Sequence, residues 1–284
     1  MEIKKVSVIG GGTMGNGIAH VFALKGFDVQ LVEMSNELAE KCIKNISANM
    51  DRQVKKGIIS QDEKNRAIGR ITKTAGIDLT PPDSDIIIEA IYENKEAKLS
   101  IFKNLNNIIK PDSIFCSNTS SISITELAAS CRPDKFIGMH FMNPVPVMKL
   151  VEIIRGYSTS DLTFNVIKDL AIKLEKVPVA VSDFPGFISN RILMPMINEA
   201  VFALMENAAS AEDIDTVMKL GMSHPMGPLT LADFIGLDVC LSIMEVLYEG
   251  FNDSKYRPCP LLKKMVAANK LGRKTGEGFF KYEY

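Results

Sequence analysis

The segment Val6-Ser-Val-Ile-Gly10-Gly-Gly12-Thr-Met-Gly15 decides the fold class, because a short strand pattern runs directly into a Gly-x-Gly-x-x-Gly turn. A helical segment, residues 17–24, follows. In such a unit Gly10 forms a tight turn, Gly12 lets the backbone approach a pyrophosphate, and Gly15 lets the helix pack closely on the strand. The amide groups and partial positive charge of the helix N-terminus attract phosphate groups. The pattern predicts a dinucleotide site that includes Gly10, Gly12, Thr13, Met14 and Gly15.

The next expected strand ends at Glu33, which bears on the type of dinucleotide. An acid about twenty residues beyond the glycine turn can accept hydrogen bonds from a ribose 2′-hydroxyl. The residues after it, Met-Ser-Asn-Glu, include no arginine that could bind a 2′-phosphate. We therefore expect NAD as the cofactor, with NADP left open.

Short β-branched runs alternate with helical stretches over residues 1–184. This alternation is typical of a doubly wound, mostly parallel sheet with helices on both faces, so we expect a Rossmann-like α/β fold. The expected strands are residues 6–9, 29–32, 71–74, 85–89, 114–117, 136–140, 150–154 and 177–181. Between the second and third strands, a long amphipathic helix that stops at Gly57 has apolar residues at every fourth position: Leu38, Cys42, Ile46, Met50 and Val54.

The strand pattern stops after residues 182–186, and the rest of the chain is expected to be helical. Its first helix, residues 187–206, is very apolar, and further helices are expected to begin near Ser210, Pro225 and Asp238. We therefore predict an NAD-binding domain at residues 1–184 and a helical substrate-binding and dimerisation domain at residues 185–284. So apolar a helix needs more cover than one small domain offers, which predicts a homodimer or an assembly of dimers.

The composition excludes several classes of protein. With 284 residues, 46% apolar and 24% charged side chains, the chain is typical of globular proteins. Its 33 basic and 34 acidic residues give a net charge of -1, so no global positive field exists to hold nucleic acid or an anionic membrane. Its 5 cysteines lack metal-ligand spacing, and no apolar run reaches the roughly 18 residues of a membrane span. We expect a cytoplasmic protein without a metal site.

Histidine is well suited to take a hydroxyl proton near neutral pH, and the chain has 3 of them. His20 lies in the first helix and is expected to be packed, whereas His224 is expected to be structural. His140 closes a strand at its carboxyl end, the edge where parallel sheets bind ligands. Glu152 follows in the expected adjacent strand, where it could orient the imidazole. The alternative for His140 is a satisfied core histidine.

Six separated motifs occur in an order that resembles the L-3-hydroxyacyl-CoA dehydrogenase family over the length of the chain. They are Gly-Gly-Gly-Thr-Met-Gly15, Ser117-Asn-Thr-Ser-Ser121, Gly138-Met-His-Phe-Met-Asn-Pro144, Pro185-Gly-Phe187 with Asn190-Arg191, His224-Pro-Met-Gly-Pro228 and Gly236-Leu-Asp238. The resemblance implies reversible oxidation of a short-chain (S)-3-hydroxyacyl-CoA with NAD. In cells that form butyrate it implies the reverse reaction, reduction of acetoacetyl-CoA.

The same resemblance implies roles for particular residues. The implied catalytic residues are the general base, its orienting partner and two hydrogen-bond donors to the substrate oxygen: His140, Glu152, Ser120 and Asn190. The further implied cofactor contacts are Glu93, Lys98, Ser120, Asn143 and Lys274. The implied coenzyme A contacts are Lys56 and the position of Asn49, where the family often has serine. Glu33 occupies a position where many members have aspartate.

Two other functions remain open from the sequence. A dehydrogenase of free small hydroxyacids shares the two-domain plan but usually relies on a catalytic lysine, which the pairing of His140 with Glu152 argues against. A catalytically inactive NAD-binding structural or redox-sensing protein would keep the same fold. The presence of all four implied catalytic residues favours an active enzyme over that alternative.

Overall fold

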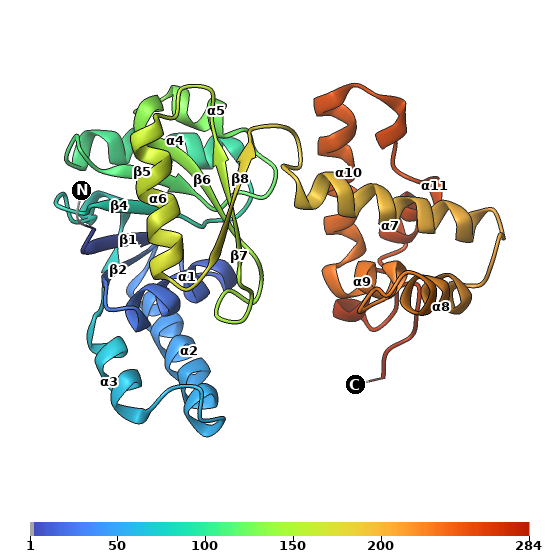
Figure 1. Cartoon of the computed structure of the whole chain (residues 1–284), viewed down its shortest axis with the longest axis horizontal. Coiled ribbons are helices and arrows are strands. Elements are labelled where there is room, and N and C mark those ends of the chain that lie inside the picture. Colours follow the sequence, from blue (N-terminus) through green and yellow to red (C-terminus); the bar gives the residue numbers. More distant parts are fainter. Residues whose placement is uncertain (1–2, 284) are drawn as a thin grey trace. The chain divides into compact units, whose positions relative to one another are not determined.

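The computed structural model describes residues 3–283 and divides the chain into two compact units, the first ending at Asp183 and the second beginning at Phe184 (Figure 1). The first unit holds an eight-stranded sheet, and the second is built from helices. Residues 1, 2 and 284, which the expected domain ranges include, lie outside the described residues. None of the described helices is long and apolar enough to span a membrane.

The sheet has the strand order β3-β2-β1-β4-β5-β6-β7-β8. Neighbouring strands run parallel except β6 and β7, which pair antiparallel, so the expected mostly parallel α/β sheet is confirmed. Strands β4, β5 and β6 are buried along their whole length, as is typical when both faces of a sheet are covered. The strands are β1 (Lys5–Ile9), β2 (Asp28–Glu33), β3 (Ile71–Ala75), β4 (Ile86–Glu89), β5 (Ile114–Ser117), β6 (Phe136–Phe141), β7 (Leu150–Arg155) and β8 (Val177–Ser182).

Several helices of the first unit begin at side-chain caps that the sequence supplies. Ser35, Ser60 and Asn94 each accept a hydrogen bond from the backbone of a first-turn residue, which satisfies a donor that the helix itself leaves unpaired. Helix α3 is not among the elements expected from the sequence, although Ser60 and Glu63 form a complete capping box at its start. The helices are α1 (Thr13–Leu24), α2 (Asn36–Lys55), α3 (Gln61–Gly69), α4 (Lys95–Ile108), α5 (Ile124–Ala129) and α6 (Asp161–Lys173).

The second unit packs its helices around a core of its own. Its first helix begins two residues later than expected, because Phe187 has a φ of +50°, in the left-handed region. The helix expected near Pro225 begins at Pro228, because the buried Asp215 carboxylate accepts hydrogen bonds from the amides of Leu229 and Thr230 in its first turn. The helices are α7 (Ser189–Met205), α8 (Ala211–Gly221), α9 (Pro228–Ile235), α10 (Leu237–Phe251) and α11 (Pro260–Ala267).

Helix α7 is covered by its own unit more fully than its composition predicts. Met194, Ile197 and Val201 are buried in a core that also includes residues of α9 and α10. The second unit therefore buries part of the apolar face of α7 by itself, and the expectation that a second copy covers the rest stays a prediction. Large apolar side chains are exposed on α7, where Ile192 is 67% exposed, and on α8, where Val217 is 59% and Leu220 is 81% exposed.

Candidate active site

The glycine turn after β1 has the geometry that a bound dinucleotide requires. Gly10 has a φ of +92°, which side-chain-bearing residues rarely adopt. A Cβ on Gly15 would lie 1.8 Å from the carbonyl oxygen of Gly10, so α1 packs this closely only because glycine is present. A Cβ on Gly12 would meet no atom within 4 Å, which leaves its backbone open to a ligand. Helix α1 begins at Thr13, so first-turn amides such as that of Met14 can bind phosphate oxygens.

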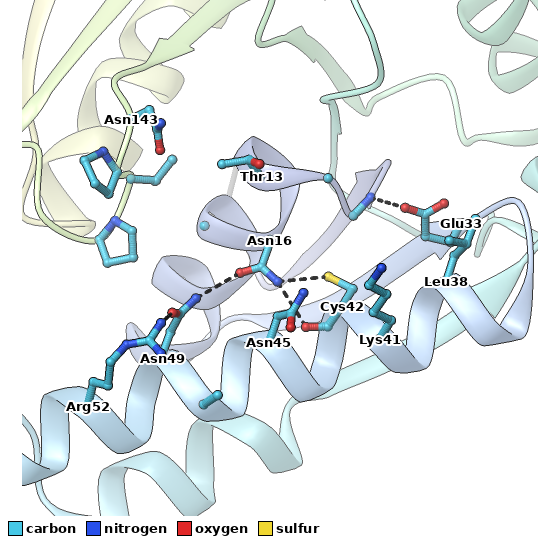
Figure 2. A pocket seen from close by; sticks show the side chains of 17 residues that line it. Thr13, Asn16, Glu33, Leu38, Lys41, Cys42, Asn45, Asn49, Arg52 and Asn143 are labelled. Atoms are coloured by element: carbon cyan, nitrogen blue, oxygen red, sulfur yellow. Dashed lines mark hydrogen bonds between the residues drawn. The ribbon is translucent and has the colours of Figure 1, made fainter. Parts of the chain in front are cut away.

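Glu33 lies beside this turn at the end of β2. Its Oε1 accepts a hydrogen bond from the amide of Gly11 at 2.6 Å, and its Oε2 accepts one from the amide of Met34 at 3.0 Å. Glu33 and Gly11 line a pocket of about 570 Å³ that extends along α2 (Figure 2). Lys41 lines the same pocket. A cation, Lys41, therefore shares the pocket with the expected ribose acceptor.

One face of α2 forms a polar wall of this pocket (Figure 2). Lys41, Asn45, Asn49 and Arg52 recur at about one helical turn and all line it. The guanidinium of Arg52 donates to Asn49 Oδ1, and Asn49 Nδ2 lies 3.4 Å from Asn16 Oδ1. The wall therefore presents two cations and two amides toward one cavity, a set that suits a phosphate-bearing ligand.

A second pocket of about 350 Å³ adjoins the first, since Asn49 and Arg52 line both. Lys56, at the end of α2, lines this second pocket together with the apolar side chains of Ile58 and Val147. The two expected coenzyme A positions, Asn49 and Lys56, are thus brought to one continuous stretch of surface on the first unit.

His140 and Glu152 face each other across the antiparallel pair β6 and β7, where they are direct partners in register. His140 Nδ1 lies 2.8 Å from Glu152 Oε2, and the two side chains are only 10% and 3% exposed. The carboxylate favours a hydrogen on Nδ1, which places the lone pair of the neutral ring on Nε2. The expected adjacent-strand contact is therefore present, and a histidine–carboxylate pair of this kind can take up and release a proton.

Ser120 lies in the loop after β5, which is fixed at both sides. Glu93 Oε1 accepts from the amide of Ser120 at 2.8 Å and lies 3.2 Å from its Oγ. Phe141 is the residue next to His140, and its amide donates a hydrogen bond to Asn118 Oδ1 at 2.9 Å. These hydrogen bonds connect the Ser120 loop to the strand that carries the histidine.

Lys98 lies behind this loop rather than on the pocket surface. Its Nζ lies 2.6 Å from Glu89 Oε1 and 3.2 Å from Glu93 Oε2, and its side chain is 1% exposed. Burial by itself raises the pKa of Glu93, but the charge of Lys98 and the hydroxyl of Thr119 outweigh it and hold that pKa below its usual range. Glu93 is therefore an anion held between a buried cation and the Ser120 loop.

Asn143 lines the main pocket from the segment that follows β6 (Figure 2). The buried Lys176 holds this segment, since its Nζ donates to the carbonyl oxygens of Val145 at 2.5 Å and Met148 at 2.7 Å. Burial lowers the pKa of Lys176, because the ammonium has left water. Lys176 thus holds the chain just after Asn143, and the hydrogen bond from the Phe141 amide to Asn118 Oδ1 holds it just before.

Two expected site residues belong to the second unit. Asn190 lies near the start of α7. Lys274 forms an ion pair with Asp238 at the start of α10. The nearby buried Asp233 accepts from the amide of Phe279 at 2.9 Å and so fastens the segment after Lys274 onto α9.

Of the other two histidines, His20 has the packed environment that the sequence predicts. His20 is fully buried in α1, and its Nε2 lies 3.0 Å from Gln53 Oε1. Burial lowers the pKa of His20, so the neutral ring is favoured. His224 lies in the turn before α9.

Two residues near the site, Glu89 and Lys41, are not predicted from the sequence. A signal for Glu89 exists, because it is a carboxylate that closes an apolar strand at the ligand edge of the sheet.

A Rossmann-type unit with an open glycine turn, and with a histidine–carboxylate pair on the same sheet, defines the class of NAD-binding dehydrogenases. Residues 5–184 match the family described as 3-hydroxyacyl-CoA dehydrogenase, NAD binding domain, and residues 186–282 match its C-terminal domain. The chain therefore belongs to the 3-hydroxyacyl-CoA dehydrogenase family and is an oxidoreductase, as its sequence motifs predict.

Relatives with known names are similar over nearly the whole chain. A 3-hydroxybutyryl-CoA dehydrogenase of Bradyrhizobium diazoefficiens is 55% identical over 99% of this chain and 96% of its own. The mitochondrial hydroxyacyl-coenzyme A dehydrogenase of Homo sapiens is 43% identical over 99% of this chain and 92% of its own. The crystal structure of (S)-3-hydroxybutyryl-CoA dehydrogenase from Ralstonia eutropha has a TM-score of 0.97 and 49% identity, with 100% of both chains covered.

Proposed function

We propose that this protein catalyses the reversible NAD-dependent oxidation of (S)-3-hydroxybutyryl-CoA to acetoacetyl-CoA. The observation that carries the proposal is the His140–Glu152 pair, which lies on the same sheet as the open glycine turn. The names of the similar proteins from Bradyrhizobium diazoefficiens and Ralstonia eutropha support a four-carbon acyl chain. In cells that form butyrate, the enzyme runs toward acetoacetyl-CoA reduction.

His140 carries the proton transfer of the proposed reaction. The glycine turn would hold NAD, which would supply a hydride acceptor for the third carbon of the acyl chain. His140 Nε2 takes the proton of the hydroxyl on that carbon, and Glu152 stabilises the imidazolium that forms. Ser120 and, by family resemblance alone, Asn190 donate hydrogen bonds to the substrate oxygen. In the reverse direction His140 returns the proton to the same oxygen.

The first unit supplies most of the proposed NAD contacts. The glycine turn and the start of α1 hold the pyrophosphate, and Glu33 accepts from the ribose. Both Glu33 oxygens already accept one amide hydrogen bond, yet a carboxylate has about four acceptor sites, so a 2′-hydroxyl can still bind. Glu93 and Asn143 act at the nicotinamide end, with Lys98 behind Glu93. The family resemblance adds Lys274 as a nucleotide contact.

The acyl-CoA substrate has phosphates that match the polar wall of α2. We assign Asn49 and Lys56 to coenzyme A on the family resemblance, and Arg52 lies between them and lines both pockets. Arginine and lysine bind phosphate through charge-assisted hydrogen bonds, and the apolar Ile58 and Val147 offer cover to the uncharged parts of the ligand.

A single assay tests the proposed reaction. Purified protein is mixed with NADH or NADPH and with acetoacetyl-CoA or a longer 3-ketoacyl-CoA, and cofactor oxidation is followed by absorbance. We expect the highest kcat/KM with NADH and acetoacetyl-CoA. No turnover with any thioester would favour the alternative, an inactive NAD-binding structural or sensor protein. Turnover of free 3-ketoacids at the thioester rate would favour a dehydrogenase of small hydroxyacids instead.

Cofactor preference should respond to a change at Glu33. Replacing Glu33→Ser together with Met34→Arg removes a charge that repels a 2′-phosphate and adds one that binds it, at a position where Met34 is 87% exposed. We expect the ratio of kcat/KM for NADPH to that for NADH to rise by about 10- to 100-fold. Adding Lys41→Met should reverse part of the gain, because Lys41 lines the same pocket. A wild type that already prefers NADPH would contradict the assignment of Glu33.

We further propose a homodimer joined through the second unit, with the exposed apolar side chains of α8 in the interface. Val217 and Leu220 lie three residues apart on that helix and are 59% and 81% exposed. Replacing both with Asp should give a monomer by light scattering, because each change would bury an unpaired charge. The matched control is Thr216→Asp, which adds a charge to an exposed neighbouring position and should leave the dimer intact. A wild type that is monomeric at micromolar concentration would refute the dimer.

A further inference from the structure

A buried chain of charged groups runs from the end of β4 to the Ser120 loop. Glu89, the last residue of β4, is 0% exposed. Its Oε1 accepts from Lys98 Nζ at 2.6 Å and from the amide of Ile91 at 2.7 Å, while its Oε2 accepts from Ser117 Oγ at 2.6 Å. Both oxygens of Glu89 are therefore occupied by groups of the protein, which fixes its orientation.

Lys98 is enclosed by this arrangement. Its three ammonium hydrogens have three acceptors within reach: Glu89 Oε1 at 2.6 Å, Glu93 Oε2 at 3.2 Å and the carbonyl oxygen of Ile91 at 3.4 Å. A buried ammonium without such partners would be very costly, so the position of Lys98 depends on Glu89. Because the side chain is 1% exposed, its effect on a ligand has to pass through a neighbour.

That neighbour is Glu93. One of its oxygens faces Lys98, and the other accepts from the amides of Ser120 at 2.8 Å and Ser121 at 3.1 Å and from Thr119 Oγ1 at 2.6 Å. Three consecutive residues of the loop are thus arranged round one carboxylate oxygen. Any displacement of Glu93 would displace the backbone that carries the Ser120 hydroxyl.

We infer that Glu89 is a positioning residue for the reaction, which acts through Lys98 and Glu93 to fix Ser120 against the substrate oxygen. The inference rests on the proposed function, because Ser120 matters only if it binds that oxygen. The competing explanation is a buried ion pair that stabilises the fold and has no effect on turnover. The two differ in what happens to kcat in protein that remains folded.

Two variants of Glu89 separate charge and shape. Glu89→Leu removes every acceptor, and we expect kcat for acetoacetyl-CoA reduction to fall by about 10- to 100-fold, since a small misplacement of a binding group costs about this much. Glu89→Gln keeps an amide oxygen for Lys98 and Ile91 and an amide nitrogen for Ser117, so it should retain kcat within about fivefold of the wild type. The same kcat for wild type and Glu89→Leu would overturn the inference.

A further variant guards against loss of folding. Replacing Glu89→Leu and Lys98→Met together removes the whole buried pair, which proteins often tolerate well in stability. Glu93 still loses its anchor, so kcat should fall as in Glu89→Leu while the thermal unfolding temperature stays nearer that of the wild type. A folded double variant with wild-type kcat would also overturn the inference.

A double-mutant cycle with Ser120→Ala tests the route. If Glu89 acts through Ser120, the combined variant Glu89→Leu with Ser120→Ala should be no slower than the slower single variant. Losses that multiply, or a Ser120→Ala variant with wild-type kcat, would contradict the route. These outcomes differ from failure of the proposed function, in which the wild type itself would not reduce acetoacetyl-CoA.

Arg132→Met provides the matched control. Arg132 is another buried cation of the first unit, and its guanidinium donates to the carbonyl oxygens of Lys110 and Ser113, before the amino end of β5. Its loss should lower the unfolding temperature and leave kcat unchanged, because parallel strands place their amino ends at the edge opposite the ligand edge. An equal fall of kcat in Arg132→Met would mean that destabilisation alone explains the Glu89 variants.

Discussion

Replacing His140→Gln is expected to lower kcat by about 10²- to 10⁴-fold, the usual contribution of a general acid or base. Glutamine fills much of the same space and can hydrogen-bond to Glu152, but it cannot take a proton near neutral pH. The glycine turn and Glu33 are unchanged, so NADH should bind with nearly the wild-type Kd. The two results are read from steady-state NADH oxidation with acetoacetyl-CoA and from NADH fluorescence titration.

The control for this variant is His224→Gln, which removes a histidine from the turn before α9 and should leave kcat within about twofold. A His140→Gln enzyme that keeps turnover within a few-fold of wild type would show that another group moves the proton. Equal loss of kcat and NADH binding would indicate a collapsed site instead, and circular dichroism and the unfolding temperature would detect that collapse.

The sequence predicts the dyad because the required contact depends on neighbouring strands alone. His140 and Glu152 lie in consecutive strands, and consecutive strands often pair, so an acid in the second can reach a histidine in the first. The glycine turn is predictable for a similar reason, since the roles of Gly10 and Gly15 follow from a strand, a turn and a helix within one βα unit. Local geometry and chain order suffice in both cases.

The buried chain behind Ser120 could not be predicted in the same way. It joins the end of β4, a residue of α4 and the loop after β5, and the sequence does not reveal which side of α4 carries Lys98 toward Glu89. The sequence also does not show which segments bury the apolar face of α7, and the reason is related. An apolar face indicates that Val201 is buried, but not whether its own unit or a second copy buries it. Both questions depend on tertiary packing between segments far apart in the chain.

Replacing Glu152→Gln is expected to lower kcat by about 10²- to 10⁴-fold, although the side chain keeps its size. Glu152 Oε2 lies 2.8 Å from His140 Nδ1, and an ionised carboxylate can only accept hydrogen bonds, so the hydrogen is placed on Nδ1. A glutamine can turn its amide nitrogen toward Nδ1, which favours the tautomer with the hydrogen on Nε2 and so removes the lone pair that accepts the substrate proton. It also leaves the imidazolium without a counter-charge in a site where the two side chains are 10% and 3% exposed.

The pH dependence of the Glu152→Gln enzyme separates this explanation from simple disruption of the site. Oxidation requires a neutral ring and reduction a charged one, and the lost carboxylate stabilised the charged ring, so the pH–rate profile should move to lower pH in both directions of assay. Glu152→Asp keeps the charge on a side chain one methylene shorter, so it should lose less kcat and move the profile less. A Glu152→Gln enzyme with wild-type turnover and an unmoved profile would refute the dyad, because His140 would then be acting as base without its orienting partner.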